Sequence, residues 1–248
     1  MSFDLPLFIA IGFAAQLIDG AIGMAYGLIS TTVLLSLGVA PPVASASVHA
    51  AEVVTTGASA LSHWRFDNID WRLCRKLASG GVVGGALGAY LLVSVPVDVV
   101  RPTVSAYLFV MGGVILWRTW RTSAQAAKKP RHVRVLGFAG GFLDAVGGGG
   151  WGPLVASTLV GRGAETRLAV GSTNAAEFLV AATISATFVA TIGLELWPII
   201  LGLILGGVLA APFAAYMTSR LPDRILMVLV GVTIMLLSLR ELLQLWPW

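Results

Sequence analysis

Residues 140–154 read GGFLDAVGGGGWGPL, and four consecutive glycines at positions 147–150 interrupt an otherwise apolar run. A glycine costs a helix interior about 1 kcal/mol relative to alanine, so this run disfavours one continuous helix. Glycine also permits tight turns and lets another group approach the backbone closely. The segment therefore predicts two helical pieces joined by a glycine turn.

The composition of the chain indicates a membrane protein. The 248 residues are 57% hydrophobic and 11% charged, and the mean hydropathy is +0.87. A soluble domain carries about 25% charged residues. Apolar segments of about 18 residues or more recur along the chain, which predicts a multi-pass protein of the cell membrane, surrounded by a lipid bilayer. The Lys and Arg residues lie beside these segments, where they set topology, and no module for a nucleic-acid partner is visible.

The chain contains an internal repeat. When the sequence is aligned with itself, Asp19 falls on Asp144 and Glu52 falls on Glu177. Matched acidic residues inside membrane segments are informative, because ionisable groups there are costly and are functional hypotheses by default. We therefore divide the chain into repeat 1 (residues 1–117), a basic cytoplasmic linker (118–134) and repeat 2 (135–248).

Each repeat contains four apolar segments. They span about 5–37, 43–63, 73–95 and 99–117 in repeat 1, and about 135–160, 168–192, 196–217 and 225–245 in repeat 2. The first segment of each repeat is too long for one span and is broken by glycine. It either crosses the membrane once or forms a re-entrant hairpin that returns to its starting side.

The distribution of Lys and Arg favours the hairpins, because cytoplasmic loops carry an excess of basic residues. With a hairpin in each half, repeat 2 is inverted and only Arg101 and Arg240 lie outside. If every segment crosses once, the outside receives Arg101, Arg162, Arg167, Arg220 and Arg224. The sequence thus predicts an all-α polytopic membrane protein with two inverted-topology repeats, each a glycine-broken re-entrant helical hairpin plus three transmembrane helices.

The hairpin tips are candidates for a substrate site. Backbone inside a membrane has to be satisfied by protein or by a water-filled cavity. The helix beyond the turn directs N–H groups at that cavity, and its dipole favours an anion. Inverted repeats whose broken helices meet near the midplane are a recurring transporter design. The predicted tips are DGAIGMAYG (residues 19–27) and DAVGGGGWG (144–152), and their binding candidates are Gly20, Gly23, Tyr26, Gly148, Gly149, Gly150 and Trp151.

Glycine has a second interpretation, which is close packing between membrane helices. We assign that role to GGVVGG (residues 80–85) and LGGVLAA (205–211). At the tips, the matched aspartates and the matched aromatic residues Tyr26 and Trp151 favour a substrate-lining role instead.

The motif SVHAAE (residues 47–52) recurs as STNAAE (172–177), so His49 aligns with Asn174. His49 and Glu52 are spaced i, i+3 and therefore share a helical face. His49 either contacts substrate and carries a coupling proton, since its pKa is ordinarily near 6.5, or ties its helix to a hairpin carbonyl. The candidates for contact with substrate in the cavity are Gln16, Ser47, His49, Ser172, Thr173 and Asn174.

Four carboxylates have two interpretations each. Asp19 and Asp144 precede the glycines, where a side chain that caps the second half-helix belongs, or they relay protons. Glu52 and Glu177 either pair with hairpin N–H groups or take part in proton coupling. We predict no metal site and no cofactor, because only one His lies deep in the membrane and no Cys is near it.

The motifs DGAIGMAYG, SASVHAAE, SHWRFDNID, GGGGWGPL and VGSTNAAE together resemble the sulfite exporter TauE/SafE family. The resemblance covers nearly the whole chain. It implies a small membrane carrier with two inverted repeats that moves sulfite, sulfonates or related sulfur-containing anions across the plasma membrane. No Lys or Arg lies deep in a segment, so backbone N–H, hydroxyl and amide groups would hold the anion.

Three functions remain open from the sequence. The first is a secondary transporter of a small sulfur-containing oxyanion that works by alternating access, either as a monomer or as a homo-oligomer. The second is an intramembrane enzyme similar to lipid-pyrophosphate phosphatases, which lacks the cation that phosphoryl transfer needs at the tips. The third is a membrane scaffold or sensor, which has no need of paired buried carboxylates. We expect a transporter and not an enzyme.

Overall fold

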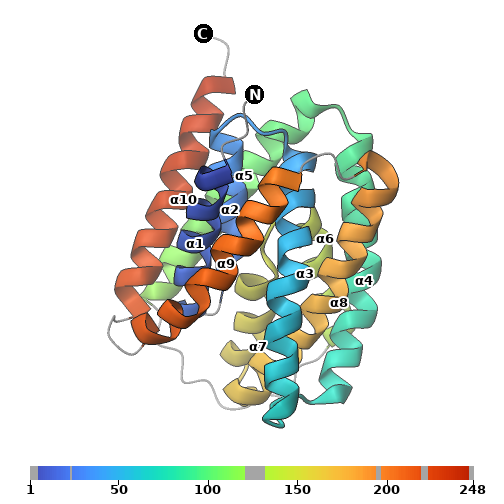
Figure 1. Ribbon diagram of the computed structural model, residues 1–248. Coiled ribbons are helices and arrows are strands. Elements are labelled where there is room, and N and C mark those ends of the chain that lie inside the picture. Colours follow the sequence, from blue (N-terminus) through green and yellow to red (C-terminus); the bar gives the residue numbers. More distant parts are fainter. Residues whose placement is uncertain (1–4, 23, 121–131, 194–196, 219–222, 246–248) are drawn as a thin grey trace.

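The computed structural model describes residues 5–22, 24–120, 132–193, 197–218 and 223–245. Every regular element in these ranges is a helix, which confirms the all-α prediction (Figure 1). The helices of the first half are α1 (Leu5–Ile22), α2 (Tyr26–Ser36), α3 (Pro41–Arg65), α4 (Trp71–Ser94) and α5 (Val97–Thr119). Those of the second half are α6 (Val133–Gly147), the π-helix η1 (Gly152–Ala156), α7 (Ser157–Gly161), α8 (Thr166–Ile192), α9 (Trp197–Thr218) and α10 (Asp223–Leu245).

Four helices in the described part of the chain are long and apolar enough to cross a membrane: α4, α5, α8 and the Arg224–Leu245 part of α10. Large apolar side chains such as Tyr90, Trp117 and Leu236 are exposed on the outside of the bundle, where lipid would cover them. A multi-pass protein of the cell membrane, as expected from the composition, has these features.

Both glycine-rich segments break a helix. α1 ends at Ile22 and α2 begins at Tyr26; α6 ends at Gly147, and helical structure resumes at Trp151. The second break has φ angles of +64° at Gly148, +152° at Gly149 and +148° at Gly150, a region that side chains with a Cβ rarely adopt. This explains the run of glycines: the backbone there takes a path that other residues resist.

The helices of the two halves pack in a reciprocal pattern. α1 packs against α9, and its predicted counterpart α6 packs against α4; α3 packs against α8, and α5 against α10. Glycines make the first two contacts close, because a Cβ added at Gly84 of α4 would lie 2.1 Å from the carbonyl oxygen of Phe138, and one at Gly206 of α9 would lie 2.1 Å from that of Ile9. The glycine stretches at 80–85 and 205–211 therefore bring helices together, as expected.

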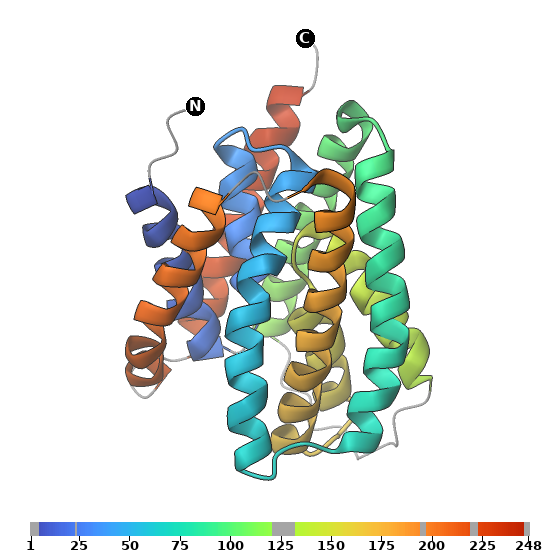
Figure 2. The same cartoon turned by 45° about the vertical axis from the view of Figure 1, so that its right-hand side comes forward.

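The ends of the bundle bear on the topology. The Arg167 side chain in the first turn of α8 donates a hydrogen bond to Asn68 Oδ1 in the α3–α4 loop, at 3.2 Å. The α2–α3 connection lies at the opposite end, with the N-terminal end of α1 (Figure 2). Single crossings by every apolar segment would put Arg167 and Asn68 on opposite sides of the membrane. The contact supports the hairpin arrangement, and the inverted repeats stay a prediction. Most of the predicted linker, residues 118–134, lies outside the described residues.

Candidate functional site

A polar cavity of about 290 Å³ lies between the two hairpins. Its walls come from the first tip (residues 19–27), the second tip (residues 144–152) and the facing helices α1, α3 and α8. The lining residues are Gln16, Asp19, Met24, Ala25, Tyr26, Gly27, Leu28, Glu52, Thr55, Thr56, Ser59, His63, Gly150, Gly152, Pro153, Val170, Asn174 and Glu177.

The two tips contact each other through their backbones. A Cβ added at Gly149 would lie 2.4 Å from the carbonyl carbon of Gly27 and 2.4 Å from the amide nitrogen of Leu28. The Thr31 hydroxyl donates a hydrogen bond to the Gly148 carbonyl at 2.5 Å, and the Tyr107 hydroxyl donates to the Gly149 carbonyl at 3.1 Å. These contacts close one side of the cavity with main chain, and only glycine leaves room for them.

Each tip holds a carboxylate that caps its second half-helix. Asp19 Oδ1 accepts hydrogen bonds from the amides of Ala25 at 2.7 Å and Tyr26 at 3.1 Å. Asp144 Oδ1 accepts one from the amide of Trp151 at 2.9 Å. This geometry supports the capping interpretation over a free carboxylate. It also corrects one expectation, because these first amides are bound by the chain's own carboxylates and are not offered to a substrate.

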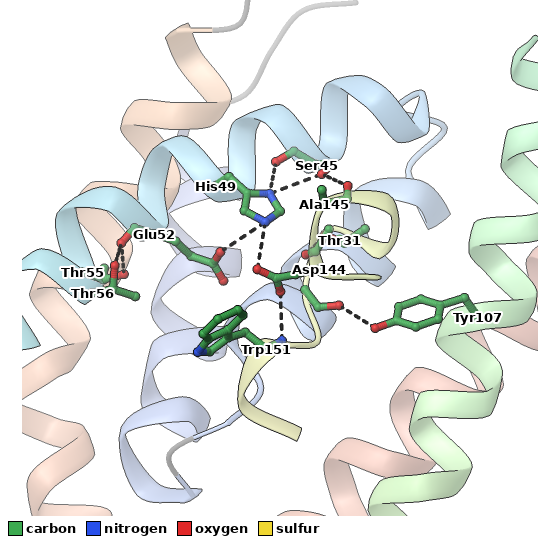
Figure 3. Close-up of polar contacts among 12 residues, drawn as sticks. Thr31, Ser45, His49, Glu52, Thr55, Thr56, Tyr107, Asp144, Ala145 and Trp151 are labelled. Atoms are coloured by element: carbon green, nitrogen blue, oxygen red, sulfur yellow. Dashed lines mark hydrogen bonds and ion pairs between the residues drawn. The ribbon is translucent and has the colours of Figure 1, made fainter. Parts of the chain in front are cut away.

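His49 lies behind the cavity, between both acidic partners (Figure 3). Its Nδ1 is 2.8 Å from the carbonyl oxygen of Ser45, and its Nε2 is 3.3 Å from Asp144 Oδ2 and 3.9 Å from Glu52 Oε2. The ring therefore joins α3 to the second tip, and Glu52 separates it from the cavity. Direct contact between His49 and a substrate in the cavity is not part of this arrangement.

The same three side chains form a group that could hold a metal ion, since one ligand atom from each lies within 4.8 Å of the others. A structural zinc site has four tetrahedral ligands, and a catalytic one has three ligands and water. The prediction of no metal at this site stays a prediction.

Seven of the predicted site residues line the cavity. They are the binding candidates Gln16, Tyr26, Gly150 and Asn174 and the carboxylates Asp19, Glu52 and Glu177. The amide of Asn174 donates to the carbonyl oxygen of Val170 at 3.1 Å, and its Oδ1 accepts from the Ser59 hydroxyl at 3.2 Å. The structure thus brings together residues from both repeats around one space.

Other predicted residues lie outside the lining. Ser47 donates to the Val43 carbonyl within its own helix, Ser172 accepts from the amide of Asp70, and Thr173 donates to the Ala169 carbonyl. Ser172 and Asn174 are two positions apart, about 200° around a helix, so they cannot face the same cavity. The remaining candidates outside the lining are His49, Asp144, Gly148, Gly149 and Trp151. Gly20 lies in the last turn of α1, and its place relative to the cavity and Gly23 are outside the described part of the chain.

Trp151 has a structural role in place of the predicted contact with substrate. Its indole is 1% exposed, and Nε1 donates to the Thr173 carbonyl at 3.1 Å. The second half-helix is thereby fixed to α8 at its first residue. Position 151 thus orients the tip without facing the cavity.

The sequence reasoning missed a polar stripe on α3. Thr55, Thr56 and Ser59 follow Glu52 at i+3, i+4 and i+7 and line the cavity, and His63 continues the same face. This spacing is the helical signal that could have identified them. The stripe supplies hydroxyl groups to a cavity that has no Lys or Arg among its described lining residues.

Helical hairpins that enclose a small polar cavity inside a bundle of membrane-spanning helices define a membrane transporter. The chain belongs to the sulfite exporter TauE/SafE family, whose model matches residues 8–240. It is 42% identical over 252 residues to the "Probable membrane transporter protein YtnM" of Bacillus subtilis (strain 168). The alignment covers 98% of this chain and 84% of that protein. The family and this relative are described as transporters and not as enzymes. No solved structure matched.

Proposed function

We propose that this transporter is a secondary carrier of a small sulfur-containing anion, such as sulfite or a sulfonate, and that it works by alternating access. The substrate site is the cavity between the hairpin tips. The observation that carries the proposal is a cavity of about 290 Å³ that both tips and both central helices line with hydroxyl and amide groups. This volume is at the small end for ligand sites, which suits a small solute.

The groups proposed to hold the anion are neutral donors. Ser59 of α3 and Asn174 of α8 line the cavity side by side, with the Ser59 hydroxyl donating to Asn174 Oδ1 at 3.2 Å, and Thr55 lies one turn from Ser59. Hydrogen bonds from neutral groups to an ionised partner are worth about 1.5–3 kcal/mol each, so a few of them suffice for a weakly bound substrate. The amides of Gly27 and Gly152 at the tips are further donors of this kind.

The carboxylates in the same cavity support a coupling of transport to protons. Asp19, Glu52 and Glu177 line it without a Lys or Arg among the described lining residues. Ionised carboxylates would repel an anion, whereas a protonated carboxyl group donates a hydrogen bond to it. We therefore propose that protons enter with the substrate.

Binding to the purified protein tests the site. Sulfite, sulfate, thiosulfate, taurine and sulfoacetate would be titrated in turn. For the anion that binds best, Asn174→Ala and Ser59→Ala are expected to weaken affinity by about tenfold or more, because each removes one hydrogen bond to a charged group. Ser47→Ala is the matched control, since its hydroxyl bonds within its own helix. If Ser47→Ala weakens binding and the other two do not, the cavity is the wrong site.

A further inference from the structure

A buried cluster adjoins the cavity where the second tip meets α3. His49 is 0% exposed, Asp144 is 1% exposed and Glu52 is 5% exposed. Glu52 lines the cavity, whereas His49 and Asp144 lie behind it. Figure 3 shows the three side chains pointing toward one another, with Glu52 and His49 from α3 and Asp144 from α6. A proton that moves between His49 and the cavity therefore passes Glu52.

The hydrogen bonds around His49 fix where its ring proton lies. The Ser45 hydroxyl donates to the Ala145 carbonyl at 2.6 Å, so its proton is not available to His49. The Ser45 carbonyl oxygen, 2.8 Å from Nδ1, accepts only. Nδ1 must therefore carry a hydrogen and donate it. In a neutral imidazole the other ring nitrogen, Nε2, then has a lone pair and no hydrogen.

That lone pair would point at two acceptors. Nε2 faces Asp144 Oδ2 at 3.3 Å and Glu52 Oε2 at 3.9 Å. Glu52 Oε2 is buried and has no hydrogen-bond partner among the described residues. Three acceptors facing one another in a buried place repel, and one proton among them turns the repulsion into hydrogen bonds. The arrangement is thus complete only when it holds a proton.

We propose that His49, Asp144 and Glu52 form the proton-binding site of this transporter, with Glu52 as its entry from the cavity. A hydronium ion in the cavity gives a proton to the Glu52 carboxylate, so that one of its O–H bonds breaks, an O–H bond forms on Glu52 and a water molecule is left. That O–H bond then breaks as Nε2 of His49 takes the proton, which leaves an imidazolium between two carboxylates. No electrons are transferred, and release follows the same steps in reverse.

The proton site is connected to the second tip. Asp144 holds His49 through Oδ2 and caps the Trp151 amide through Oδ1, so one carboxylate contacts both the proton site and the half-helix. Without the proton, Asp144 Oδ2 loses its donor and the link from α3 to the tip weakens. This link would allow the proton to alter the position of the tip, and this part of the proposal rests on the proposed transport function.

Other titratable groups face this cluster from the neighbouring helices. Glu177 of α8 and Asp19 of α1 interact electrostatically with Glu52, as does Tyr26 of α2, and Tyr107 of α5 interacts with Asp144. The cluster therefore titrates together with the cavity, and the measured midpoint belongs to the group.

The matched half of the chain lacks this device. Asn174 is the counterpart of His49 in the second half of the chain, and an amide cannot take up a proton at neutral pH. Its nitrogen donates to the Val170 carbonyl and its oxygen accepts from Ser59, so it needs no further hydrogen. One proton site for the two halves is therefore expected.

Nitrogen NMR of the purified, ¹⁵N-histidine-labelled protein tests the proton site without any substrate. The chain has 3 histidines, and the His49 signals are those that His49→Gln removes. We expect Nε2 to change from protonated to unprotonated between about pH 5 and pH 9 while Nδ1 stays protonated, with a midpoint that moves in Glu52→Gln. An Nε2 that stays in one state throughout, or purified protein with one bound metal ion per chain that His49→Gln removes, would overturn the proposal.

Transport in proteoliposomes tests the coupling. The probe is sulfoacetate, measured both as exchange at equal pH and as uptake driven by a pH gradient. His49→Gln is expected to lower the ratio of driven uptake to exchange about tenfold. His132→Asn, at the start of α6 and outside the cluster, is the control for loss of a histidine. An unchanged ratio in His49→Gln would contradict the coupling role. If no anion from the binding screen is moved at all, the proposed function fails, while the NMR titration still decides the proton site.

Discussion

At the scale of the residue, the site depends on aspartates that cap helices and on glycines that leave space. Asp19 and Asp144 each bind amides six or seven positions along the chain, so each tip is a turn fixed by its own carboxylate. Gly149 lies against the backbone of Gly27. These are local features with a direct effect on the cavity, because both tips form its walls.

Gly149→Ala is expected to destabilise the protein strongly. Its φ of +152° is strained for alanine, and the new methyl group would lie 2.4 Å from the first tip. Together these effects predict a loss of about 2 kcal/mol or more. Thermal unfolding in detergent micelles measures the loss. Gly113→Ala is the control, because a Cβ there has nothing within 4 Å, and equal melting of the two variants would contradict the tip contact.

Replacement of Asp19 separates its capping role from its charge. Asp19→Ala removes the acceptor for the amides of Ala25 and Tyr26 and is expected to cost about 1 kcal/mol of stability. Asp19→Asn keeps an acceptor oxygen in place and is expected to retain most of that stability. Thermal unfolding of both variants checks this. Equal losses in the two would show that the negative charge, and not the cap, supports the tip.

At the scale of the element, glycines decide which helices pack together. The first helix of each hairpin packs closely on the third membrane helix of the other half, α1 on α9 and α6 on α4. Gly12 and Gly206 lie against the partner backbone where α1 meets α9, and Gly84 and Gly141 do so where α4 meets α6. Small residues allow helix backbones to approach in a membrane, where lipid removes the hydrophobic drive for association. The first helix of each half is therefore held by a helix of the other half.

Two neighbouring glycines of α9 give a sharp test of this packing. A Cβ at Gly206 would lie 2.1 Å from the Ile9 carbonyl oxygen, whereas one at Gly207 would lie 3.4 Å from its nearest neighbour, a methyl carbon of Thr55. Gly206→Ala is expected to force α1 and α9 apart and to cost about 1–3 kcal/mol. The free energy of unfolding of Gly207→Ala should lie within about 1 kcal/mol of that of the parent protein, since alanine favours the helix. The reverse order would mean that α1 and α9 do not pack at this register.

At the scale of the whole molecule, the positions of the basic residues at the two ends of the bundle predict its sidedness. The α3–α4 loop and the first turns of α4, which carry Arg72 and Lys76, lie at the same end as Arg167. Arg101, at the other end of the bundle, is paired with Glu241 at 3.1 Å, and its guanidinium also donates to the Leu35 carbonyl. Basic loops face the cytoplasm, so the Arg167 end is expected to lie inside.

Cysteine labelling measures this sidedness. Cys74 is the single cysteine and is buried, so Cys74→Ala provides the background. In intact cells, a membrane-impermeant maleimide is expected to label Leu37→Cys at once and Arg162→Cys only after the membrane is opened. Leu37 follows α2 and Arg162 follows α7, and these two helices end at opposite ends of the bundle (Figure 1). Labelling of both from outside would exclude the inverted repeats, and labelling of Arg162→Cys alone would show that the Arg162 end lies outside the cell.

Local pattern was sufficient for much of this fold. Hydropathy gave the helical membrane class, because burial in lipid requires long apolar helices. The positions of Asp19 and Asp144 before glycine turns indicated capping as one of two interpretations, because capping depends on residues close in sequence. The glycine run at 147–150 predicted the helix break, because a break also depends on residues close in sequence.

The tertiary structure decided which residues line the cavity. Ser47 and Ser172 lie in the same short motifs as residues that line the cavity, but their hydroxyl groups bond elsewhere. Ser59 and His63 lie further along α3 and do line the cavity. The rotation of α3 and α8 selects these faces, and it is fixed by contacts between segments far apart in the chain, such as the Trp151 indole on the Thr173 carbonyl. A sequence specifies which residues share a face of a helix, but only packing determines where that face points.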